Sequence, residues 1–184
     1  MDEKQAIQRL KDGDIGGLEF LVQRHQVKAV RTAYLITQDL AMAEDVVQES
    51  FIQAFRAVHG FNDAKPFAPW FMRSVVHAAE KSAQKAAKRV PAKSESDENR
   101  LEELLGNEES AEAQVISAEF EREVWDALQE LSPRQRAAIV QRYFLDMSEK
   151  EMAESLEAPP GTVKWLLHAA RRNLKSLLRQ EVEK

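Results

Sequence analysis

The stretch SEKEMAESLEAPPGTVKWLLHAARR, residues 148–172, has the layout of two helices joined by a tight turn. Ser148 and Glu151 form a Ser-x-x-Glu capping box, and Met147 is placed for the hydrophobic staple that often accompanies one. After a turn at residues 157–160, apolar residues recur at helical spacing: Val163, Leu166, Leu167, Ala170, Leu174, Leu177 and Leu178. We therefore predict a short helix, a turn and a longer helix.

The second of these helices carries a basic face. From residue 159 to residue 180 there are five Lys or Arg residues and no acidic residue. The polar residues that fall away from the apolar stripe are Lys164, His168, Arg171, Arg172 and Lys175. This is the arrangement of a helix-turn-helix, whose second helix enters the DNA major groove by its N-terminal part. The alternative is a plain helical hairpin with a solvated basic face.

Charge is distributed unevenly along the 184-residue chain, whose net charge is −5. Residues 73–93 hold six basic and one acidic residue, residues 94–123 hold two and eleven, and residues 159–184 hold six and two. Two basic stretches are thus separated by a strongly acidic one. Such local asymmetry says more about the partners of a protein than its total charge does.

Several classes of chemistry are excluded or disfavoured by the composition. Cysteine is absent, which excludes disulfides, thiolate catalysis and thiolate metal sites. The four histidines form no metal-binding spacing such as H-E-x-x-H, and the sequence has no phosphate-binding loop. No segment approaches the ~18 uninterrupted apolar residues of a membrane span, and the N-terminus lacks the features of a signal peptide. We expect a cytoplasmic protein that is not an enzyme and has no cofactor or metal.

Helical periodicity runs through most of the chain, and no strand pattern is sustained in the sequence. The pattern predicts N-terminal helices over residues 2–11, 15–36, 40–58 and 67–89, and C-terminal helices over 118–131, from Ser132 onward, from Ser148 onward and over 160–180. Ser132, Pro133 and Gln135 can open the second C-terminal helix with a capping box.

The stretch 92–117 is rich in Glu and Ser and poor in aromatic residues, which is typical of a flexible linker. The expected fold class is therefore all-α: two small helical domains, residues 1–91 and 118–184, joined by a flexible acidic linker. The second domain contains the helix-turn-helix.

The predicted helix 40–58 has an apolar side and an acidic side. Asp45, Gln48 and Glu49 lie three and four residues apart, so they share a face. The opposite, core-facing side is expected to hold Leu40, Ala43, Val46, Val47, Phe51, Ala54, Phe55 and Val58. Taken alone, an ordinary solvated acidic face explains this pattern as well as a docking surface does.

The predicted helix 67–89 carries a basic stripe. Arg73, His77, Lys81, Lys85 and Lys88 follow one another at intervals of four, four, four and three residues. This stripe lies opposite apolar residues of the same helix. Trp70 precedes the stripe, and core packing and a binding role are equally open for it.

The C-terminal motifs resemble the fourth conserved region of bacterial sigma factors, most closely the extracytoplasmic-function (ECF) group. The segments that carry the resemblance are WDALQELSPRQR at 125–136, MAESL at 152–156, GTVK at 161–164 and ARRNL at 170–174. The resemblance implies that this module binds the upstream, minus-thirty-five promoter element. The residues that it places at the DNA are Thr162, Lys164, Trp165, His168, Arg171 and Arg172.

The segment AEDVVQESFIQA at 43–54 resembles the second conserved region of the same family. This implies that Asp45, Gln48 and Glu49 dock on a coiled coil of the largest subunit of RNA polymerase. The following loop and helix would then bind and open the downstream, minus-ten element through Asn62, Trp70, Arg73, His77, Lys81 and Lys85. The partners implied are core RNA polymerase, promoter DNA and an anti-sigma factor, and the function is promoter recognition, DNA opening and transcription initiation.

The sequence departs from the family pattern at a few positions. Members usually have Asn at the position of His77, Asp at that of Lys81, and Ser-Arg where Trp165 and Leu166 stand. The promoter sequence therefore cannot be carried over. The alternative function is a one-component DNA-binding regulator with an N-terminal sensor or dimerisation domain, which would not bind core polymerase.

Overall fold

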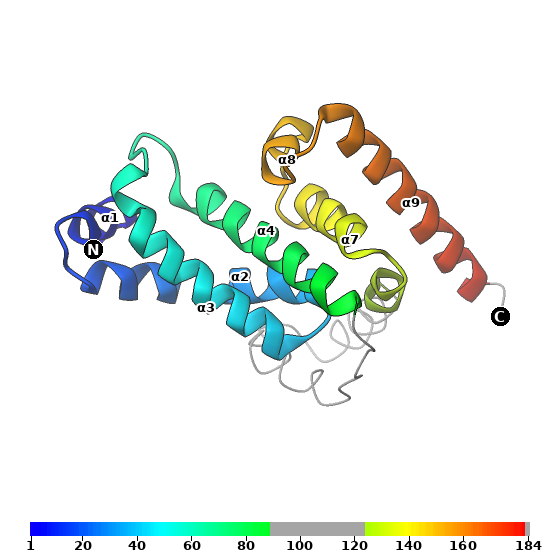
Figure 1. Ribbon diagram of the computed structural model, residues 1–184, viewed down its shortest axis with the longest axis horizontal. Coiled ribbons are helices and arrows are strands. Elements are labelled where there is room, and N and C mark those ends of the chain that lie inside the picture. The colour runs from blue at the N-terminus through cyan, green and yellow to red at the C-terminus, as the bar shows by residue number, and fades with distance from the viewer. Residues whose placement is uncertain (89–123, 183–184) are drawn as a thin grey trace. The chain divides into compact units, whose positions relative to one another are not determined.

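The computed structural model describes the backbone of residues 1–88 and 124–182, and side chains up to residue 176. Every regular element in these ranges is a helix, which confirms the all-α class (Figure 1). The chain divides into two compact units, Met1–Ser82 and Ala83–Lys184, and each is considered by itself. The predicted linker, 92–117, lies outside the described residues, so the predicted domain bounds remain a prediction.

The first unit contains four α-helices and one 3₁₀ turn, and the last helix, α4, continues past its boundary at Ser82. Their bounds are α1 Glu3–Lys11, α2 Gly16–Thr37, α3 Leu40–Ala57, η1 Val58–Gly60 and α4 Phe67–Ala87. The predicted ends agree within two residues. Asp2 and Asp39 cap α1 and α3 by accepting the backbone N–H groups of Gln5 and Met42.

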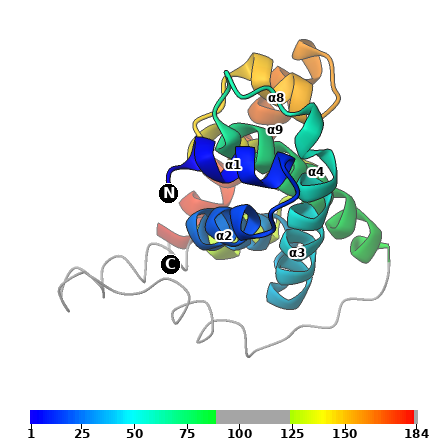
Figure 2. The same cartoon turned by 90° about the vertical axis from the view of Figure 1, so that its left-hand side faces the viewer.

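Helix α1 lies beside α2 in both views of the molecule (Figures 1 and 2). Gly17 makes this close approach possible, because a Cβ atom at that position would collide with the carbonyl oxygen of Ala6 and press on Leu10. The connection between the helices is tied by Asp14, which accepts hydrogen bonds from the Gly16 N–H and from Arg9. These two interactions lower the pKa of Asp14.

An aromatic cluster fills the centre of the first unit. Phe71 stacks on Phe51 of α3 with ring centroids 4.3 Å apart and on Phe67 at 5.5 Å. Both Phe67 and Phe71 are almost completely buried. One predicted core position is wrong: the side chain of Phe55 is 38% exposed, because it lies at the edge of the face that α3 packs inward.

Beyond α4, the described part of the second unit contains helical residues 124–129, three α-helices and a π-helical turn. Their bounds are α7 Pro133–Ile139, η2 Val140–Phe144, α8 Glu149–Ser155 and α9 Pro160–Val182. Both predicted capping boxes, at Ser132 and at Ser148, are confirmed. The π-helical turn was not predicted, since its apolar spacing resembles that of an ordinary helix.

Arg136 is a buried cation in this unit. It is 8% exposed, and its Nη1 donates to the carbonyl oxygen of Leu131 at 3.1 Å. Burial lowers the pKa of Arg136, because desolvation disfavours the charged form. Arg136 therefore holds the segment before α7 in place and is not available to an anionic partner.

We predict that Gly17→Ala destabilises the first unit by about 1–3 kcal/mol, because the added methyl group must push α1 away from α2. Gly60→Ala is the matched control, since a Cβ there meets no atom within 4 Å. Urea unfolding followed by circular dichroism measures both changes. Equal midpoints for the two variants would show that α1 and α2 are not in close contact.

Candidate functional site

Helices α8 and α9 form the predicted helix-turn-helix. Ser148 opens α8 by accepting the Glu151 N–H, while the Glu151 carboxylate accepts the Ser148 N–H at 2.8 Å. The turn places Glu157 in the left-handed region, with φ at 49°. The Ala158 N–H then donates to the carbonyl oxygen of Ala153 at 3.0 Å, which closes the end of α8.

Helix α9 separates a buried stripe from an exposed face. The stripe contains Val163, Leu166, Leu167 and Ala170. The predicted upstream-element residues lie as follows: Lys164, Trp165, His168, Arg171 and Arg172 are exposed, and Thr162 is half-buried in the first turn. Leu166 departs from the family pattern but is only 4% exposed, so it packs in the core while its neighbour Trp165 is 64% exposed.

Two exposed cations of α9 have partners among the residues that the structure describes. Lys164 lies 3.9 Å from the Glu149 carboxylate, and both side chains are largely exposed, so this pair contributes little. Arg171 is held more firmly: its Nε donates to the Tyr143 hydroxyl at 2.6 Å, and its guanidinium lies 5.6 Å from the centre of the same ring.

Tyr143 was missed by sequence reasoning. It belongs to the π-helical turn η2 and is 58% exposed, so it was not needed to complete any apolar stripe. Its partner Arg171 is 28 residues away in the sequence. No local pattern signals such a contact, and only the packing of the unit brings the two residues together.

The acidic face of α3 is exposed as predicted. Asp45, Gln48 and Glu49 are exposed, whereas Val46 and Val47 between them are buried. Two apolar side chains extend the same face: Ile52 and Phe55 are 36% and 38% exposed. With Gln48 they are spaced four and three residues apart, so α3 presents a mixed acidic and apolar stripe.

The loop at residues 61–66 and α4 carry the remaining predicted site residues. His77, Lys81 and Lys85 are exposed along α4, and Arg73 is half-buried. Asn62 is exposed, but its side-chain oxygen already accepts the Ala64 N–H at 3.0 Å.

Trp70 serves in packing and also reaches the surface. Its ring lies 5.0 Å from that of Phe61 and 5.5 Å from that of Phe67, measured between centroids, and the residue is half-exposed. Core packing and a binding role, the two interpretations left open for Trp70, are therefore compatible.

Other kinds of site find no support in the part of the chain that the structure describes. There, no three His, Asp or Glu side chains gather closely enough to hold a metal ion. Among the described helices none is both long and apolar enough to cross a membrane.

Two family models match the chain. The model for sigma-70 region 2 matches residues 21–89, and the model for sigma-70 region 4 matches residues 121–174. The two matched segments include α3 with α4 and α8 with most of α9. The two matches together define a sigma-70-type transcription initiation factor.

Relatives identify the group within this class. The chain is 30% identical over 177 residues to the ECF RNA polymerase sigma-E factor of Haemophilus influenzae, covering 93% of this chain and 92% of that protein. It is 28% identical to the RNA polymerase sigma-H factor of Pseudomonas aeruginosa, covering 97% and 96%. The chain belongs to the ECF sigma factors of bacterial RNA polymerase.

Solved structures agree with this fold. The structure of CnrH in complex with the cytosolic domain of CnrY matches with a TM-score of 0.64 at 20% identity, covering 97% of this chain and 99% of that chain. The sigma factor RpoE in complex with the anti-sigma factor NepR from Bartonella quintana gives the same TM-score and identity, covering 88% and 97%.

We predict that Glu157→Gly stabilises the second unit by about 0.5–1 kcal/mol, because a residue with a Cβ atom is strained in the left-handed conformation. Glu157→Ala removes the same carboxylate but keeps the Cβ atom, so it should bring no such gain. Chemical denaturation of both variants separates the effect of backbone strain from that of charge. A gain of the same size in Glu157→Ala would contradict the strain argument.

Proposed function

We propose that this sigma factor docks on core RNA polymerase through the exposed stripe of α3 and recognises promoter DNA with both of its units. Asp45, Gln48 and Glu49 provide the polar part of the docking surface, and Phe55 adds an apolar anchor. The loop 61–66 and the exposed side of α4 bind and open the downstream element. The exposed face of α9 binds the upstream element.

The observation that carries this proposal is that α9 and α3 each bury one face in the core and expose another face of distinct chemistry. In α9, the cations are exposed while the apolar stripe between them is buried. In α3, the acidic residues are exposed beside apolar side chains that the unit leaves uncovered. A basic face suits phosphate and base edges, whereas a mixed acidic and apolar face suits a protein partner.

The exposed residues of α9 differ in their proposed contacts according to their position along the helix. Lys164 and Trp165 lie in its first two turns, the part of a recognition helix that reaches base edges. Trp165 provides an apolar surface for thymine methyl groups, and Lys164 can donate to guanine. Arg171 and Arg172 lie farther along, where side chains reach phosphates, and Tyr143 holds the Arg171 guanidinium toward that role.

We further propose that the protein acts in the cytoplasm, without catalysis of its own, and that an anti-sigma factor controls it. Family membership supports the first part, because a sigma factor works on RNA polymerase. One solved structure with a similar fold holds the sigma factor RpoE in complex with the anti-sigma factor NepR, and another holds CnrH in complex with the cytosolic domain of CnrY, which supports the second part.

The experiment that tests the function is run-off transcription with core RNA polymerase on fragments of the source genome. Specific transcripts that require this protein support the proposal and map its promoters. A one-component regulator would neither recover core polymerase in a pull-down nor start transcripts with it.

We predict that Asp45→Arg weakens binding to core polymerase at least tenfold, since the reversed charge faces a partner that accepts an acidic surface. Gln48→Ala should weaken it less. Folding should change little, because exposed substitutions usually alter stability by only about 0.5 kcal/mol. Glu19→Arg is a control with the same charge change on α2, and its affinity in a fluorescence binding assay should match wild type. Wild-type affinity of Asp45→Arg would contradict the docking assignment.

We predict different effects for two cations of α9. Lys164→Ala should cost roughly 1–3 kcal/mol and relax preference at one base pair. Arg171→Ala should weaken all promoters alike and reduce the slope of log affinity against log salt by about 1. Lys150→Ala, an exposed cation of α8, is the control. Unchanged promoter preference in Lys164→Ala combined with an unchanged salt slope in Arg171→Ala would rule out α9 as the recognition helix.

A further inference from the structure

Helix α1 precedes the segment that the region 2 model matches, yet it holds the loop 61–66. The ammonium group of Lys11 donates to the carbonyl oxygen of Phe61 at 3.0 Å and pairs with the Asp63 carboxylate at 2.7 Å. These two residues flank Asn62 on either side. The Lys11 side chain is only 18% exposed, so water weakens these interactions less than it weakens those of a surface lysine.

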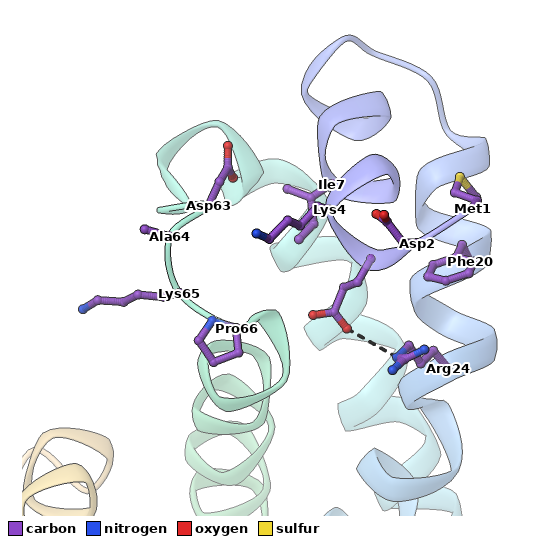
Figure 3. Close-up of a pocket in the computed structure, with 11 residues that line it drawn as sticks. Met1, Asp2, Lys4, Ile7, Phe20, Arg24, Asp63, Ala64, Lys65 and Pro66 are labelled. Carbon is purple, nitrogen blue, oxygen red and sulfur yellow. Dashed lines mark ion pairs between the residues drawn. The ribbon is translucent and has the colours of Figure 1, made fainter.

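A second contact from α1 holds the end of the same loop. The Phe67 N–H donates to Glu3 Oε1 at 3.4 Å, and the other oxygen of Glu3 lies 2.9 Å from His25 Nε2. The same oxygen lies 3.5 Å from Arg24 Nε, the ion pair drawn as a dashed line in Figure 3. The His25 ring also lies 5.5 Å from the Phe67 ring, measured between centroids. Glu3 thus ties the start of α4 to α1 and α2 at once.

Between these two contacts the loop has little support of its own. Among the described residues, the other hydrogen bonds of residues 62–66 are local: Asn62 accepts from the Ala64 N–H with its side chain and from the Lys65 N–H with its carbonyl oxygen. Residues 62–66 are exposed. A hollow of about 630 Å³ separates Ala64, Lys65 and Pro66 from α1 and α2, with Lys4 extending into it (Figure 3). The position of the loop therefore depends on its two ends.

We propose that Lys11 and Glu3 are positioning residues for recognition of the downstream promoter element: they fix the loop 61–66 so that Asn62 meets its base in one geometry. This inference rests on the proposed role of the loop. A loop that moves still approaches DNA, but it discriminates poorly between bases, because the cost of a wrong base depends on donors and acceptors held in fixed places.

The test compares Lys11→Met with wild type in holoenzyme assembled from core polymerase and the full chain. The probes are a promoter mapped by run-off transcription and its single-base variants in the downstream element. In Lys11→Met, the ratio of transcription between the native promoter and these variants should fall by about threefold to tenfold, the size expected from losing the net contribution of one ordinary hydrogen bond. Binding to core polymerase and the thermal midpoint should stay close to wild type.

Conservative and matched variants distinguish a positioning role of Lys11 and Glu3 from a general loss of stability. Lys11→Arg should keep most of the discrimination. Lys4→Met removes the same charge from the same helix, and it should behave as wild type. Glu3→Gln, which keeps an acceptor for the Phe67 N–H, should retain more discrimination than Glu3→Ala. Unchanged discrimination in both Lys11→Met and Glu3→Ala would overturn the inference.

Two further variants make the result decisive. Asp63→Ala breaks the ion pair from the loop side, without altering α1, and so decides the matter if Lys11→Met unfolds. The double variant Lys11→Met, Asp63→Ala should lose no more discrimination than Lys11→Met alone, because both changes break the same ion pair. If the two losses of discrimination multiply in the double variant, the inference is overturned. Asn62→Ala tests the loop itself: if it leaves discrimination unchanged, the proposed role of the loop fails, whatever Lys11 does.

Discussion

The stacked rings of Phe67 and Phe71 provide the constraint on which the first unit depends. They pack against Phe51 of α3 and His25 of α2, so the start of α4 is fixed against two other helices. Burying one such ring contributes about 1.5–3 kcal/mol, and a well-placed aromatic pair adds about 0.5–1.5 kcal/mol. Because this cluster sets where α4 begins, it also sets where the exposed stripe of His77, Lys81 and Lys85 lies.

Local patterns predicted the helices well because the signals are local. A Ser-x-x-Glu or Ser-Pro-x-Gln box brings its donors and acceptors together within one turn, so residues 132–135 and 148–151 could be interpreted directly. Whether a residue at the edge of a helix face is exposed does not follow from such local signals. Phe55 fits the apolar period of α3, but its burial depends on how far the neighbouring helices reach, and they leave it uncovered.

Contacts between distant residues were beyond prediction from this single sequence. Arg171 was placed at the DNA by resemblance, but nothing in the chain indicated that Tyr143 would hold its guanidinium. Lys11 and Glu3 appeared only as ordinary charges on a short helix. In each case the partner lies 28 or more residues away, and the geometry follows from tertiary packing.

The position of α1 has a consequence for how similarity in this family is interpreted. The matched segment of region 2 starts at residue 21, so it contains the loop 61–66 but neither residue of α1 that holds it. Two proteins with identical loops can therefore present them differently if their first helices differ. Gly17 belongs to the same arrangement, since it allows the close approach of α1 to α2, and α1 carries the Lys11 that contacts Phe61 and Asp63. In the proposed function, the part of the chain that contacts a base and the part that fixes this contact are separate in sequence, and the packing of the unit brings them together.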